Sequence, residues 1–234
     1  SLTNYEEYLV SEWYSDPFRK DIYVELDEMD AGPNGEPRSK LPEESKEMIF
    51  LAFDRQNIVF HLDDGEMGGH DIVPFDTTGD NTTRQELDDI YYYKYFLEED
   101  ENYWKKGVFH YGIVVYNATF PGFCYRTNAY QISSKGMDEN ARGIFTGNRD
   151  IVYATGYMHE LGHSLGLMWL GGHSRDAYYP WQILFWKYRP YESIMNYGYM
   201  YGTWSDLCDY SDGSNGRNDY DDWSNIDFSY FDEN

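Results

Sequence analysis

The strongest helical pattern in the chain is DIVYATGYMHELGHSLGL, from Asp150 to Leu167. At about 100° per residue, with His159 at zero, His163 lies at about 40° and Glu160 at about 100°. Four apolar residues gather at about 200–260° on the same helical wheel: Ala154, Met158, Leu161 and Leu165. We therefore predict a helix that packs its apolar face on a core and presents both histidines together on another face.

Residues 159–163, His-Glu-Leu-Gly-His, have the spacing of a metal site on a helix. His159 and His163 are one turn apart, so their imidazoles can reach a single cation. Chance predicts this pattern only about 0.01 times in a chain of this composition. Neutral imidazole suits a zinc site with three protein ligands and one open position for water. Glu160 can take the proton of the activated water, which predicts hydrolysis of a carbonyl substrate, most simply a peptide bond.

Two motifs in order resemble one known clan of zinc peptidases. The run HELGHSLGL resembles the start of the metzincin signature, in which a glycine, here Gly166, ends the zinc helix. The run SIMNY at 193–197, about 30 residues downstream, is similar to the Met-turn of that clan. The resemblance implies a structural role for Met195 beneath the metal, and a catalytic role for Tyr197 as a hydrogen-bond donor to the oxyanion.

The same resemblance implies how the domain is organised. It implies one catalytic domain over 1–234, with a cleft between two subdomains. The N-terminal subdomain is about 1–166 and ends with the active-site helix 150–167, and the C-terminal subdomain, 167–234, carries the Met-turn. The runs DIYVELDEMD and DYSDGSNGRNDYDDW are also similar to microbial, especially archaeal, metzincin-like sequences.

The third metal ligand departs from the metzincin pattern. In the usual spacing it follows Gly166 by three residues, but Trp169 occupies that position and an indole cannot bind zinc. The next histidine is His173, directly after two glycines that would allow a longer loop to reach the metal. Asp176 is a second candidate and Glu192 a third, because carboxylates also bind zinc.

The rest of the chain predicts an α+β fold. Alternating residues over 21–26 (DIYVEL) predict a half-buried strand, and 107–116 (GVFHYGIVVY) predict another. A helix is expected after Pro42, and the pattern becomes irregular after Gly171-Gly172. We expect an α/β N-terminal subdomain with a twisted mixed sheet, and a loop-rich C-terminal subdomain. By the resemblance, 107–117 is the candidate for a strand at the cleft that pairs with an extended substrate.

Composition excludes several classes of partner. The 18 Lys+Arg against 42 Asp+Glu give a formal charge of -24, a field that repels nucleic acid and anionic lipid. No apolar stretch reaches the roughly 18–20 residues that span a bilayer, so we expect no membrane insertion. A peptide or protein substrate remains as the expected partner, and a monomer is the favoured oligomeric state.

Further metal sites and a disulfide are weaker expectations. The glycine-rich stretch from His61 to His70 is a candidate second metal site, although a solvated loop explains it as well. Five acids near the C-terminus supply the oxygen ligands that calcium prefers, without the spacing of a calcium loop: Asp209, Asp212, Asp219, Asp221 and Asp222. Cys124 and Cys208 could form one bridge, which would suit an oxidising compartment. We expect a secreted or extracytoplasmic protein.

Two functions from different classes therefore remain. The first is a zinc-dependent endopeptidase in which Glu160 is the general base. The alternative is a non-catalytic binding module, derived from a peptidase fold and stabilised by zinc or calcium. Glu160 favours the enzyme, because a purely structural zinc site needs no carboxylate at this position.

Overall fold

The computed structural model describes residues 13, 15–16, 18–65, 67, 71–75, 82–94, 96–97, 103–143, 146–202 and 207–231. Its strands are β1 (Lys20–Met29), β2 (Ile58–Asp63), β3 (Ile72–Val73), β4 (Phe109–Val115), β5 (Gly122–Arg126) and β6 (Ala129–Ser133). Its α-helices are α2 (Glu43–Arg55), α3 (Arg84–Asp89), α4 (Ser134–Asn140), α5 (Arg149–Ser164), α6 (Ile183–Lys187) and α7 (Asp222–Asn225). A π-helical segment η2 (Ile90–Lys94) extends α3, and η3 (Arg175–Ala177) and η4 (Met200–Gly202) are single 3-10 turns.

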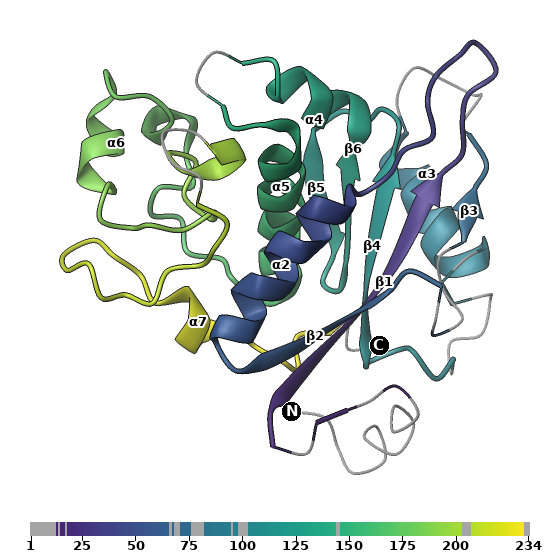
Figure 1. Ribbon diagram of the computed structural model, residues 1–234, viewed down its shortest axis with the longest axis horizontal. Coiled ribbons are helices and arrows are strands. Elements are labelled where there is room, and N and C mark those ends of the chain that lie inside the picture. The colour runs from purple at the N-terminus through teal and green to yellow at the C-terminus, as the bar shows by residue number, and fades with distance from the viewer. Residues whose placement is uncertain are drawn as a thin grey trace.

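These elements form a six-stranded mixed sheet with helices packed on it, which confirms the α+β class. The strand order is β2-β1-β4-β6-β5, and β3 pairs with the end of β1. The pairs along this path are parallel except for β5, which runs antiparallel to β6. Figure 1 shows α2, α4 and α5 in front of the sheet and α3 on its other side. Among the described residues, no helix has the length and apolar character that a membrane span requires.

The strand expected over 21–26 is longer than predicted and is not half-buried. In β1, every residue from Ile22 to Met29 is buried. The prediction of one solvated face was wrong because β1 lies inside the sheet and both of its faces are covered. Val24 and Leu26 belong to the core under the helices, whereas Tyr23 belongs to a second core on the opposite face.

The second face of β1 also carries buried charges. The Lys105 ammonium lies 2.5 Å from Glu25 Oε2 and 3.1 Å from Asp63 Oδ2, and all three side chains are at most 2% exposed. Burial raises the pKa of Glu25 to about 8, although the ammonium of Lys105 acts to lower it. Lys105 is therefore the cation that stabilises the negative charge of the carboxylates buried in this layer.

Replacing Lys105 with Met should lower the free energy of unfolding by about 3–5 kcal/mol at pH 8, because it leaves buried carboxylates without their cation. A carboxyl whose pKa is raised by folding stabilises the fold below its unfolded pKa of about 4.3, and this contribution is lost as pH rises through the folded value. The loss should therefore be much smaller at pH 5. Urea denaturation at both pH values measures it, with the exposed Lys40→Met as the control. Equal losses in the two variants would contradict the buried-cation role.

Candidate metal centre

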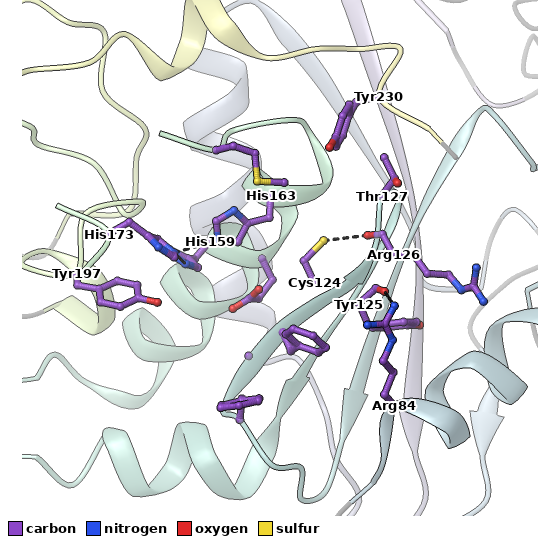
Figure 2. A pocket seen from close by; sticks show the side chains of 15 residues that line it. Arg84, Cys124, Tyr125, Arg126, Thr127, His159, His163, His173, Tyr197 and Tyr230 are labelled. Carbon is purple, nitrogen blue, oxygen red and sulfur yellow. Dashed lines mark hydrogen bonds between the residues drawn. The ribbon is translucent and has the colours of Figure 1, made fainter. Parts of the chain in front are cut away.

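Helix α5 carries the central motif and is buried along most of its length. It begins after Asn148, whose side-chain oxygen accepts a hydrogen bond from Ile151 N, and it ends at Ser164. It is thus shifted slightly from the predicted 150–167, because the chain turns at Gly166 with a φ of 82°. His159 and His163 project from this helix toward the C-terminal loops (Figure 2).

Three imidazoles converge at one point. His173 Nε2 lies 3.1 Å from His163 Nε2 and 3.2 Å from His159 Nε2. A tetrahedral ion with metal–nitrogen bonds of about 2.0–2.1 Å holds its ligand atoms about 3.3 Å apart, which agrees with both separations. His159, His163 and His173 can therefore hold one metal ion.

The other ring nitrogens of the helical histidines fix their orientation. Nδ1 of His159 lies 2.8 Å from the Ile194 carbonyl oxygen, and Nδ1 of His163 lies 3.0 Å from the Leu167 carbonyl oxygen. A carbonyl only accepts, so each Nδ1 carries the proton and donates. Each Nε2 therefore presents a lone pair to the metal position, the arrangement that outer-shell partners impose on metal-bound histidines.

Burial also keeps these rings neutral. Desolvation lowers the pKa of His159 well below its ordinary value, and it lowers the pKa of His163 as well. The pKa of His173 falls to about 4 for the same reason, with a further contribution from His163. All three imidazoles are accordingly unprotonated at neutral pH, as metal ligation requires.

The loop after α5 explains how His173 reaches the two helical histidines. Trp169, at the usual ligand position, packs among aromatic rings, stacking on Tyr220 at 5.1 Å and meeting Tyr191 edge-on at 4.7 Å. Gly172 has a φ of 77°, and a Cβ there would come within 2.6 Å of Asn196 Oδ1. Its carbonyl accepts a hydrogen bond from Tyr197 N. The backbone contact with Tyr197 and a glycine conformation together direct His173 to the metal position.

The two carboxylate candidates do not join this group. Asp176 is exposed in η3, and Glu192 is exposed just before the turn at 193–197. Neither belongs to the set of side chains whose ligand atoms gather around the histidines. Of the three candidates for the third ligand, the structure brings only His173 within reach.

Met195 lies against the helix between the two histidine turns. It is 3% exposed, and its Sδ would be 2.6 Å from a Cβ placed on Gly162. The neighbouring Asn196 holds the turn, because its Nδ2 donates to the carbonyls of Tyr188 and Tyr191. This contact places the Met195 side chain against the backbone of α5 at Gly162, next to His163 in the chain.

Glu160 points from α5 into the cleft and lies against strand β5. Its side chain is buried, and burial raises its pKa to about 8, partly offset by a hydrogen bond from the backbone of Cys124. Gly122 is the point of closest approach, since any Cβ there would overlap the carboxylate of Glu160. A carboxyl group whose pKa lies near neutrality can accept and return a proton.

Tyr197 lies beside the histidines. Its ring centroid is 4.4 Å from that of His173 and 5.7 Å from that of His159. Burial raises the pKa of its hydroxyl, with Glu160 adding to the effect, so the phenol keeps its proton at neutral pH. Figure 2 shows the hydroxyl facing the cleft, where it can act as a hydrogen-bond donor.

A cleft of about 750 Å³ opens in front of the histidines. Strand β5 forms its wall, together with Glu160, Tyr197 and Arg84. The sequence placed the cleft strand at 107–117, and this was wrong: β4 lies inside the sheet between β1 and β6. The edge strand next to the site is β5, whose short sequence GFCYR has no pattern that separates an edge strand from an interior one.

The weaker metal candidates are placed elsewhere. His61 Nε2 is 2.7 Å from Asp21 Oδ1 and its ring stacks on Tyr23, whereas His70 lies outside the described residues. The five C-terminal acids mostly serve as acceptors within their own loop, as where Asp219 accepts from Ser211 Oγ, and they form no three-ligand group. The second such group among the described residues is Glu25, Asp27 and Asp71, near Lys105. Cys124 and Cys208 are not joined by a disulfide.

Comparison of the chain with protein-family models and with curated proteins gives no match. The assignment of a function therefore depends on the geometry of the histidines, Glu160 and the cleft.

Proposed function

We propose that this protein is a zinc-dependent endopeptidase of the metzincin type. One observation carries the proposal: three convergent imidazole nitrogens and a buried carboxylate face an open cleft. His159, His163 and His173 would hold the metal. Three neutral nitrogen ligands and an accessible position for solvent are the donor set of catalytic zinc, whereas structural zinc has four protein ligands and a closed shell. This difference supports the enzyme over the non-catalytic module.

A zinc ion held by His159, His163 and His173 would lower the pKa of its bound water and polarise the substrate carbonyl. Glu160 then takes the proton of the attacking water and returns it to the nitrogen of the leaving amine, so it serves first as base and then as acid. The Tyr197 hydroxyl, which keeps its proton, donates a hydrogen bond to the oxyanion of the substrate.

The substrate would bind as an extra strand along β5. In the described sheet, β5 pairs on one side with β6 and is the last strand of the order. An extended peptide can satisfy the backbone groups on the outer side of an edge strand. Such a peptide would pass Glu160 at Gly122 and continue toward Arg126. Because β5 continues beyond the reacting bond, it could pair with further substrate residues past that bond. This supports cleavage within a peptide chain rather than at its end.

The order of elements supports the metzincin assignment as well. A mostly parallel sheet ends in the antiparallel strand β5, α5 packs on the sheet, and Met195 packs against Gly162 of α5. These features agree with the resemblance of the HELGHSLGL and SIMNY runs. This chain would depart from the metzincin pattern in the longer loop before His173, which has Trp169 in the usual ligand position.

Removal and return of the metal tests the proposed function. Zinc-loaded protein should cut an unfolded protein substrate into internal fragments, and treatment with a chelator should abolish this cleavage. Adding one equivalent of zinc should restore it, since the histidines are oriented by their carbonyl partners. Mass spectrometry of the fragments measures the reaction. Cleavage that is unaffected by the chelator, or the absence of any cleavage, would contradict the proposal.

A further inference from the structure

Two arginines line the far end of the cleft of this strongly acidic protein. The chain has a formal charge of -24, yet the described part of the cleft lining carries two arginines, Arg84 and Arg126, besides Glu160. Figure 2 shows both arginines across the cleft from the histidines, beyond Cys124. Two guanidinium groups gathered at one end of a substrate cleft point to a ligand that carries negative charge.

Arg84 is held at the wall of the cleft by the backbone. It is the first residue of α3, and its Nη2 donates to the carbonyl oxygen of Tyr125 in β5 at 3.0 Å. Its side chain is 64% exposed, so the group is open to solvent. A guanidinium has five N–H donors in a planar fork, and one contact to a carbonyl leaves others for a ligand.

Arg126 is oriented by aromatic rings. Its guanidinium lies 5.0 Å from the ring centroid of Tyr91 and 5.2 Å from that of Tyr92. Its Nε is 2.9 Å from Asp88 Oδ1, and the side chain is 24% exposed. Stacking restricts the side chain before any ligand binds, which lowers the entropy cost of recognition.

Both guanidinium groups lie near one carboxylate. Asp88 contacts Arg126 and lies 3.9 Å from Arg84, so one carboxylate serves two guanidinium groups. The two guanidinium groups are some distance from the reacting groups. Gly122, which touches Glu160, and Arg126 are the two ends of β5. Four residues of strand span about 13 Å, so an extended peptide would place a side chain there three or four residues from the bond to be cut.

We propose that Arg84 and Arg126 form a carboxylate-recognition subsite that selects substrates with a negative charge about three or four residues from the cleaved bond. The carboxylate belongs either to an acidic side chain or to the C-terminus of the substrate. This inference rests on the proposed peptidase function. It also runs against the expectation from net charge alone, which would favour basic substrates.

Matched peptides test the subsite. A cleaved peptide is remade with Glu or Gln at each of the four positions on both sides of the bond, and each version carries a free or an amidated C-terminus. One Glu position, or the free C-terminus, should raise kcat/KM about tenfold over its neutral counterpart. The Arg84→Gln, Arg126→Gln double variant should reduce this ratio to about one. The ratio should also fall as salt is raised, because the arginines are partly exposed.

Control variants separate recognition from structural damage. Arg217→Gln removes one exposed positive charge away from the cleft and should leave the Glu/Gln ratio unchanged. Arg84→Lys and Arg126→Lys keep the charge and should retain part of the preference. A merely structural role for the arginines would instead lower kcat/KM equally for Glu and Gln peptides. Thermal melting verifies the fold, and Arg84→Gln alone, at an exposed side chain, remains informative if Arg126→Gln unfolds.

Binding distinguishes failure of this inference from failure of the proposed function. The Kd of fluorescent Glu and Gln peptides is measured by anisotropy, which needs no cleavage. Cleavage without any preference for Glu or a free C-terminus would overturn the subsite and leave the peptidase proposal intact. Binding that prefers the carboxylate without cleavage would support the subsite and contradict the peptidase. Equal binding of Glu and Gln peptides in the absence of cleavage would overturn both.

Discussion

Replacing Glu160 with Gln should reduce kcat for peptide cleavage by about 10²–10⁴-fold while zinc binding persists. Gln has nearly the same size and can keep the hydrogen bond from the Cys124 backbone, but it cannot take a proton from water. The three imidazole nitrogens are separate from this side chain, so the metal site should keep its affinity. Single-turnover cleavage of one peptide measures the loss, and zinc content is measured on the same sample.

The exposed Glu139 in α4 provides a matched control, because Glu139→Gln removes a carboxylate outside the cleft. That variant should cleave at the wild-type rate. Unchanged cleavage by the Glu160→Gln variant would exclude this residue as the general base. Loss of zinc together with activity would show instead that Glu160 supports the metal site.

Replacing His173 with Ala should weaken zinc binding by more than about 100-fold. Removing an outer-shell partner of a metal-bound histidine typically costs about 10–100-fold in affinity, and loss of a direct ligand should cost more. His173 Nε2 is within 3.2 Å of both helical Nε2 atoms, so its loss leaves a two-histidine site. Competition with a chromogenic chelator measures the affinity, and anomalous scattering from zinc-bound crystals identifies the ligands directly.

Asp176→Ala and Glu192→Ala are the matched controls, because these carboxylates are the alternative third ligands and both are exposed. Each should keep zinc affinity within about threefold of wild type, as expected for surface substitutions away from the site. A loss of zinc in either variant, with His173→Ala unaffected, would assign the third position to a carboxylate. The proposed ligand set would also be contradicted if the His173→Ala variant cleaved peptide at the wild-type rate and with the wild-type dependence on zinc.

Local periodicity was enough to predict the part of the site that lies on one helix. His159, Glu160 and His163 are within five residues, so the geometry of an α-helix alone puts them on neighbouring faces. The structure has that helix over Arg149–Ser164, close to the range expected. The α+β class followed in the same way from strand and helix patterns along the chain.

Strand burial and strand order could not be predicted locally. The alternation over 21–26 is the pattern of a solvated face, yet Glu25 is buried against Lys105, a residue 80 positions later in the chain. Likewise β4 has the stronger strand sequence, but β5 is the edge strand at the cleft. Which strand ends a sheet depends on pairing between distant segments, and the sequence of one segment does not contain that information.

The sequence by itself determined that two imidazoles and a carboxylate lie on neighbouring faces of one helix. The tertiary structure alone decided which side chain completes the metal group and what lines the cleft. His173 is brought to the helix by Gly172 and the turn at Asn196, and Arg84 meets Arg126 through the Tyr125 carbonyl. The spacing of side chains along a helix is fixed by the hydrogen bonds of that helix. The contacts of His173 and of the two arginines depend instead on the packing of segments that are far apart in the chain.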